Sequence, residues 1–168
     1  MEDTVDNTHI REEIAHLQGK YLTILLDGRQ YGVCITKVEE ILIGYMAITR
    51  VPLSPPFLKG VVNLRGRIIP VVNLRSKIGL QEKGADKETC ILVVKVSIDD
   101  RPFVMGMIVD TVLEVIDFDH SMLALASSHG MQLNTEYITG MGALPDGNSV
   151  ILIDLNEIFR SLGATLTQ

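Results

Sequence analysis

Side chains able to bind metal ions or act as nucleophiles are present, but their spacing does not form a site. The two cysteines, Cys34 and Cys90, lack the Cys-x-x-Cys spacing of zinc and redox motifs. Cys34 lies in an apolar segment, which is typical of a buried, unreactive thiol. The histidines are also dispersed along the sequence, at His9, His16, His120 and His129. We therefore predict no metal site.

Motifs of the common enzyme classes are absent as well. The chain contains no phosphate-binding Gly-Lys-Ser/Thr loop, no Gly-x-Ser-x-Gly, no His-Glu-x-x-His and no Gly-x-Gly-x-x-Gly. Asp110 and Glu114 are of the residue types that serve as general acid and base, but both occur in segments with strand character, where exposed faces account for them. The sequence predicts a protein that is not an enzyme and uses no cofactor.

A long stretch without acidic residues, from Ile41 to Gln81, contains six basic ones: Arg50, Lys59, Arg65, Arg67, Arg75 and Lys77. Within it, Arg65 precedes Gly66 between two apolar runs, which places a guanidinium at a hairpin tip, ready for bidentate contacts with carboxylates. A solvated turn arginine is the alternative interpretation. Nucleic-acid binding is less favoured, because the chain has no tryptophan and a net charge of -6.

Charge is uneven along the 168 residues, of which 46% are hydrophobic. Residues 1–18 hold five acids and one base, and the segment Ser97–Asp119 holds six acids against Arg101. These segments are either solvated faces or surfaces that steer charged partners. The N-terminus is acidic without the apolar core of a secretory signal, and no apolar run is long enough to span a membrane. The sequence predicts a cytoplasmic protein.

The secondary structure that must position the charged and polar residues is predicted to consist mainly of short strands joined by tight turns. Lys20–Leu26 is an apolar run, and Asp27-Gly28 tolerates positive φ in a hairpin, so the chain returns along Gln30–Ile35. Other predicted turns are Arg65-Gly66, Asp99-Asp100 and Asp146-Gly147-Asn148. Strands at this spacing predict an all-β fold of the antiparallel barrel or sandwich type.

Helix signals are few. Asp154, with a glutamate three residues later, fits a capping box that opens a helix over residues 155–162. Asn73 can cap a one-turn helix that follows it. The acidic residues 1–18 are predicted to form a flexible tail, with a short amphipathic helix as the alternative, and residues 164–168 form a second tail.

A weak internal repeat divides the chain. The pattern Gly-x-x-β-x-x-Val-x-Glu-β, where β is Ile or Val, starts at Gly32 and again at Gly106. The aligned pairs include Glu40 with Glu114, Gly60 with Gly140, and Leu64 with Leu144. The repeat predicts two similar halves, over about residues 19–80 and 89–153, with residues 81–87 as a connector. Each half is predicted to be a small β-barrel that shares a core with the other.

The order of several motifs resembles the CheW family of chemotaxis coupling proteins. The most specific block is Asn63-Leu64-Arg65-Gly66, flanked by Gly-Val-Val before it and Ile-Pro-Val-Val after it. Weaker pieces in the family's order extend the resemblance over about residues 19–163: Tyr21-Leu22-Thr23, Tyr31-Gly32-Val33, Val38-Glu39-Glu40-Ile41, Gly106 to Val112, and Tyr137-Ile138-Thr139-Gly140. Family members often have Asp at the positions of Cys34 and Asn73.

The resemblance implies two five-stranded SH3-like barrels that share a core, followed by a short C-terminal helix. It implies a non-catalytic cytoplasmic adaptor at membrane-associated receptor arrays, without direct membrane insertion. Its partners would be the cytoplasmic tip of methyl-accepting chemoreceptors and the regulatory domain of the histidine kinase CheA. A role in a pilus or gliding motility pathway is the alternative. The receptor-facing residues implied by position are Val38, Glu40, Gly60, Val61, Asn63, Leu64, Arg65, Gly66 and Val112, with Glu40 and Arg65 as an ion pair.

Overall fold

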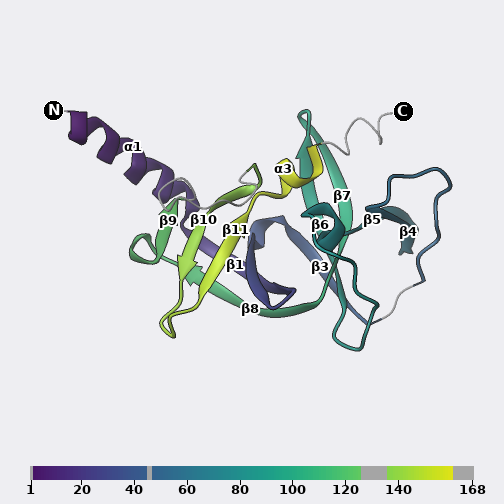
Figure 1. The fold of residues 1–168 in the computed structure, drawn as a ribbon. Helices are drawn as coiled ribbons and strands as arrows, with labels where there is room; N and C mark the ends of the chain where they lie inside the picture. Colours follow the sequence, from purple (N-terminus) through teal and green to yellow (C-terminus); the bar gives the residue numbers. More distant parts are fainter. Residues whose placement is uncertain (1, 45–46, 126–135, 161–168) are drawn as a thin grey trace.

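About half of the described chain lies in β-strands and little of it in helices, in agreement with the predicted all-β class (Figure 1). The computed structural model describes residues 2–44, 47–125 and 136–160. The strands are β1 (Gly19–Leu26), β2 (Arg29–Cys34), β3 (Val38–Ile43), β4 (Leu58–Leu64), β5 (Arg67–Asn73), β6 (Cys90–Ile98), β7 (Arg101–Val109), β8 (Thr111–Phe118), β9 (Leu123–Leu125), β10 (Ile138–Ala143) and β11 (Ser149–Ile153). The helices are α1 (Glu2–Leu17), α2 (Leu74–Lys77) and α3 (Leu155–Phe159), with single 3-10 turns at Ile35–Lys37 and His120–Met122. Among these elements, no helix has the length and apolar character needed to cross a membrane.

The strands form two sheets, and each sheet draws strands from both halves of the chain. The first sheet has the order β8-β1-β2-β11-β10-β9, and the second has the order β3-β6-β7-β5-β4. The predicted division into one barrel over residues 19–80 and another over 89–153 is therefore wrong as to strand membership. The physical reason is that the chain changes sheet between β2 and β3, and again between β7 and β8. Parallel pairs, β2 with β11 and β5 with β7, join the two halves within each sheet.

The internal repeat relates the two sheets to each other. The hairpin β1–β2 occupies the place in the first sheet that β6–β7 occupies in the second, and β8 occupies the place of β3. The pair β10–β11 likewise corresponds to β4–β5. The prediction of two similar halves thus holds for the order of the strands, although the halves exchange β3 and β8.

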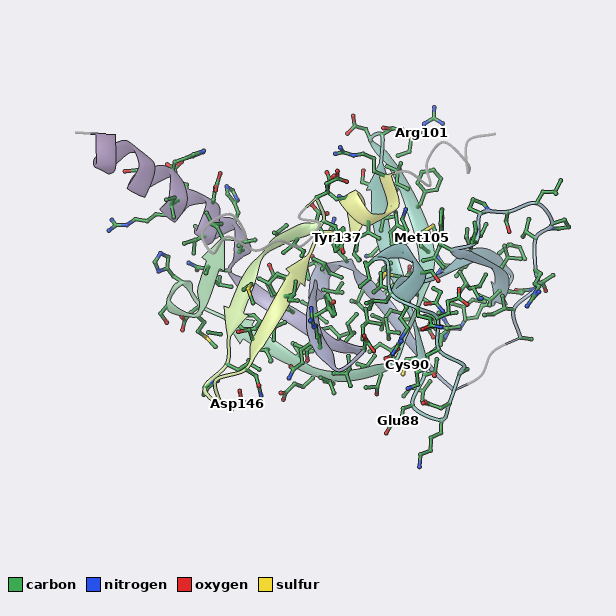
Figure 2. All side chains as sticks on the ribbon, viewed as in Figure 1. Glu88, Cys90, Arg101, Met105, Tyr137 and Asp146 are labelled. Carbon is green, nitrogen blue, oxygen red and sulfur yellow. The ribbon has the colours of Figure 1, made fainter. Side chains whose placement is uncertain are left out.

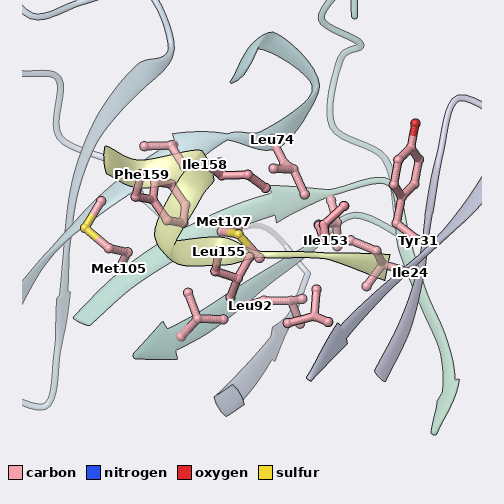
Figure 3. Close-up of a cluster of buried hydrophobic side chains, with 14 of the residues drawn as sticks. Ile24, Tyr31, Leu74, Leu92, Met105, Met107, Ile153, Leu155, Ile158 and Phe159 are labelled. Carbon is pink, nitrogen blue, oxygen red and sulfur yellow. The ribbon is translucent and has the colours of Figure 1, made fainter. Parts of the chain in front are cut away.

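A shared apolar core fills the space between the sheets. Side chains from both sheets contribute, including Ile24 and Ile153 from the first and Leu92 and Met107 from the second (Figure 3). Helix α3 adds Phe159, which is fully buried. Burial of one such side chain contributes about 1.5–3 kcal/mol to the free energy of folding. The apolar contacts of this core are therefore the main interaction that holds the two sheets together.

Each sheet also curls around a smaller apolar cluster of its own. In the second sheet the inner cluster receives side chains from all five strands: Leu42, Val62, Leu64, Ile69, Val71, Ile91, Val93, Val104 and Ile108. The first sheet has a similar cluster around Phe118, with Tyr21 edge-on to its ring. Within the described residues, no hydrogen-bonded ladder joins the two edge strands of either sheet, so the sheets are curled but open.

The N-terminal helix replaces the flexible tail that the sequence predicted for residues 1–18. Helix α1 projects from the body in Figure 1, and its last turn is anchored where the Tyr21 hydroxyl donates to the Leu17 carbonyl oxygen at 2.8 Å. Leu17 and Ile14 also pack against the inner cluster of the first sheet. An acidic sequence forms a helix here because its last turn gains these apolar contacts.

The two short helices begin at the predicted caps. The side chain of Asn73 accepts from the backbone N–H of Arg75, and that of Asp154 accepts from Asn156, at 3.0 and 2.9 Å. The capping box at Asp154 is not completed, because the Asp154 backbone N–H donates to the Tyr137 carbonyl oxygen at 2.8 Å and Glu157 pairs with Arg160 instead. Helix α3 opens as predicted for residues 155–162, and the end of that range and the tail 164–168 lie outside the described residues.

Candidate partner-binding surface

The tip of the β4–β5 hairpin fixes Arg65 on the surface. Arg65 and Gly66 have φ of 52° and 84°, the two positive values that a tight hairpin turn requires. The side-chain oxygen of Asn63 accepts from the backbone N–H of Gly66 at 2.9 Å, which locks the turn. The side chain of Arg65 is 74% exposed. The predicted hairpin tip is confirmed.

Arg65 makes a bidentate ion pair with Glu40 of β3. The two guanidinium nitrogens lie 2.9 and 2.6 Å from the two carboxylate oxygens. These hydrogen bonds, together with the charge of Glu40, raise the pKa of Arg65 above its ordinary value. A second pair, Arg67 with Glu39 at 2.9 Å, lies beside it. Both ion pairs join β3, an edge of the second sheet, to the β4–β5 hairpin at the other end of that sheet: Arg65 lies in the hairpin turn and Arg67 begins β5.

Gly60 is a structural position, because a side chain there would collide with the backbone. A Cβ atom at Gly60 would lie 2.1 Å from the carbonyl oxygen of Thr49, and the residue has φ of 144°. Its neighbour Val61 exchanges two backbone hydrogen bonds with Thr49, at 2.8 and 2.9 Å. This close backbone approach holds residue 49 against the outer edge of β4.

The structure separates the nine predicted receptor-facing residues into three groups. Asn63, Arg65 and Gly66 are exposed at the hairpin tip, whereas Gly60 and Leu64 are buried. The other four are partly buried: Val38, Glu40, Val61 and Val112. Leu64 belongs to the inner cluster of the second sheet, so its side chain is not available to a partner.

Two of the partly buried residues mark where the sheets meet. Val38 lies at the start of β3 and Val112 near the start of β8, which belong to different sheets. Both side chains pack against the shared core. The prediction thus includes residues from both sheets, and the shared core connects them beneath the surface.

Sequence reasoning missed the exposed isoleucines around the ion pairs. In β3 the side chains alternate, and the outward positions hold Glu39, Ile41 and Ile43, the last of which is 80% exposed. On β5, Ile68 is 63% exposed. The alternation of side chains along a strand could have revealed them: if Val38 points inward, then Ile41 and Ile43 point outward. Exposed apolar side chains beside a fixed ion pair are typical of a protein-binding surface.

The titratable residues of the described ranges do not gather into a metal centre. No group of three histidine, cysteine, aspartate or glutamate side chains in these ranges could hold a metal ion. Cys90 is buried, and its burial raises the pKa of the thiol. Cys34 is only partly buried, with its sulfur 3.2 Å from the hydroxyl of Thr36. The chemistry that the surface does offer is charge pairing and apolar contact.

A family model described as a CheW-like domain matches residues 20–163. The chain belongs to the CheW-like domain family. The matched region starts after α1 and contains both sheets and α3.

Individual CheW proteins are similar to this chain over most of their length. The chemotaxis protein CheW of Klebsiella aerogenes is 37% identical over 142 residues, which are 84% of this chain and 82% of that protein. CheW of Bacillus subtilis is 30% identical over 139 residues, which are 83% of this chain and 85% of that protein. The crystal structure of the scaffolding protein TtCheW from Thermoanaerobacter tengcongensis has 30% identity and a TM-score of 0.73, covering 84% of this chain and 92% of that one.

Proposed function

We propose that this chain is a non-catalytic adaptor that links the cytoplasmic tip of chemoreceptors to the histidine kinase CheA. Membership of the CheW family supports this role, and so does the scaffolding protein among its structural relatives. The adaptor would work in the cytoplasm at membrane-associated receptor arrays. We also propose that the two curled sheets correspond to SH3-like barrels, since each surrounds an inner apolar cluster.

The observation that carries the proposal is the Glu40–Arg65 pair at the exposed hairpin tip, next to an outward face of β3 that holds Glu39, Ile41 and Ile43. An exposed pair contributes little to folding, but a pair that a partner removes from water couples more strongly to binding. Glu40 holds the guanidinium in one position, so Arg65 presents its remaining donors and its apolar stem in a fixed geometry. We propose that this surface receives the receptor tip.

Binding of a cytoplasmic chemoreceptor fragment to the full chain tests the proposal. Arg65→Glu should weaken binding about tenfold or more, because like charges then face each other, and should leave the thermal midpoint close to wild type. Arg101→Glu, at the β6–β7 turn (Figure 2), makes the same charge change and should bind normally.

A charge exchange provides the second arm of the experiment. The double variant Glu40→Arg with Arg65→Glu restores an ion pair and should recover part of the receptor binding. Normal binding by the single variant Arg65→Glu would contradict the assignment of this surface. Unfolding of that variant would show that the pair serves folding instead.

A further inference from the structure

The repeat places a second glutamate in the same local geometry as Glu40. Glu114 of β8 aligns with Glu40 of β3, and each strand has a β-bulge at this point. In β3 the extra residue lies between Val38 and Glu40, and in β8 it lies between Val112 and Val115. Bulges of this kind redirect side chains and are common next to functional sites.

The bulge in β8 is held by a buried hydroxyl group. Thr23 of β1 is fully buried, and its hydroxyl donates to the Glu114 carbonyl oxygen at 2.7 Å and accepts from the Glu114 N–H at 3.1 Å. Both backbone groups of Glu114 are therefore satisfied inside the protein. Three consecutive side chains are left exposed, with Leu113 at 44% and Val115 at 49% on either side of the carboxylate.

The second half lacks the arginine that completes the pair in the first half. The β10–β11 turn, which corresponds to the turn of Arg65, carries Asp146 (Figure 2), and the sequence from Ile138 to Ile153 contains no lysine or arginine. In the part of the chain that the structure describes, the carboxylate of Glu114 has no hydrogen bond or ion pair. Asp117 lies in the same strand, with Lys20 of β1 as its cross-strand neighbour.

The backbone beside Glu114 is also open to a partner. Strand β8 is an edge of the first sheet and pairs only with β1 among the described strands. An edge strand can accept another strand through its free N–H and C=O groups. The exposed carboxylate, the two apolar side chains and the free edge are next to one another on one strand.

We propose that the segment Leu113–Val115 of β8 binds an arginine-bearing β-hairpin of another protein. The arginine would pair with Glu114 as Arg65 pairs with Glu40, and apolar residues beside it would contact Leu113 and Val115. A second copy of this chain is a poor source of the arginine, because its Arg65 is held by its own Glu40. The proposal goes beyond the adaptor function, since it does not depend on which protein binds the Arg65 surface.

A suitable probe is a cyclic peptide with the sequence of residues 60–71, closed between Gly60 and Val71, which are paired in the chain. Titration of the peptide into the full-length protein should shift the backbone amide NMR signals of Leu113, Glu114 and Val115. Glu114→Gln should weaken binding about tenfold or more, the size of a lost charge-assisted hydrogen bond. Asp100→Asn, at an exposed turn beside Arg101, removes the same charge and should not change binding.

A double-mutant cycle isolates the ion pair. A peptide with Arg65→Gln should bind wild-type protein as weakly as the natural peptide binds Glu114→Gln, and combining both changes should add little further loss. Equal binding by wild type and Glu114→Gln, or amide shifts confined to β3, would overturn the proposal. So would absence of peptide binding at millimolar concentration. Self-association of the protein that Glu114→Gln abolishes would assign the edge to a second copy instead.

Discussion

Arg75 forms a bidentate ion pair with Asp110, the residue that connects β7 to β8. Nε lies 2.7 Å from one carboxylate oxygen and Nη2 lies 2.5 Å from the other. The same carboxylate accepts from the backbone N–H of Asp27 in the β1–β2 turn, and Arg75 also donates to the carbonyl oxygen of Gln81. One ion pair therefore ties α2, the connector and both sheets together.

Removal of this carboxylate should destabilise the protein measurably. The side chains of Arg75 and Asp110 are only 11% and 13% exposed, so Asp110→Asn leaves a poorly solvated guanidinium with only the exposed carboxylate of Asp27, 3.9 Å away, as counter-charge. We expect a loss of about 2 kcal/mol in the free energy of unfolding, measured by urea denaturation. Glu39→Gln breaks the more exposed pair with Arg67 and should cost under about 1 kcal/mol. Equal losses in the two variants would contradict this prediction.

The same pair should make stability depend on acid. Hydrogen bonds from Arg75 hold the pKa of Asp110 below its ordinary value. Because the folded pKa is lower than the unfolded one, this contribution is complete above about pH 4 and is lost as the pH falls through the folded pKa. The stability difference between wild type and Asp110→Asn, followed by denaturation from pH 7 to pH 3, should shrink at the acidic end. A constant difference would show that Asp110 does not titrate in this range.

Two glycines should respond differently to the same substitution. Gly60→Ala drives a Cβ atom into the carbonyl oxygen of Thr49, so we expect a loss of about 2 kcal/mol or more and faster hydrogen exchange at Thr49. Gly66→Ala meets no atom within 4 Å and bears only the cost of positive φ, about 1 kcal/mol. Calorimetric melting compares the two, and a larger effect at Gly66 would refute the steric explanation.

Substitutions of Leu64 and Ile68 should have opposite effects on stability and on receptor binding. Leu64→Ala removes a buried side chain from the inner cluster of the second sheet, and we expect a loss of about 2–4 kcal/mol in stability. Ile68→Ala changes an exposed side chain and should alter stability by no more than about 0.5 kcal/mol. Receptor-fragment binding should follow the reverse order once both variants are compared in their folded state. Preserved stability in Leu64→Ala would place that side chain outside the core.

Local sequence chemistry predicted the local structure well. Asp27-Gly28 and Arg65-Gly66 form their turns with positive φ, and Asn73 and Asp154 cap the helices that follow them. The ion pair between Glu40 and Arg65, which the family resemblance implied, is present. These features depend on a few neighbouring residues or on a motif, and both are visible in the printed sequence.

The sheet that each strand joins could not be predicted in the same way. Strands β3 and β8 carry the same pattern, so the repeat alone cannot show that each pairs with the hairpin of the other half. Burial of Leu64 beside exposed Arg65 likewise depends on how the second sheet curls. The helical state of residues 2–17 depends on contacts of Leu17 with a cluster formed by strands far along the chain.

The exchange of β3 and β8 sets the order in which a newly made molecule can mature. The β1–β2 hairpin emerges from the ribosome well before its neighbours on both sides, β8 and β11. Until β8 and β11 have been made, the apolar face of this hairpin stays exposed to chaperones and to other nascent chains. A truncation before β11 would leave the first sheet incomplete beside β2, so this sheet can close only after β11 has been translated.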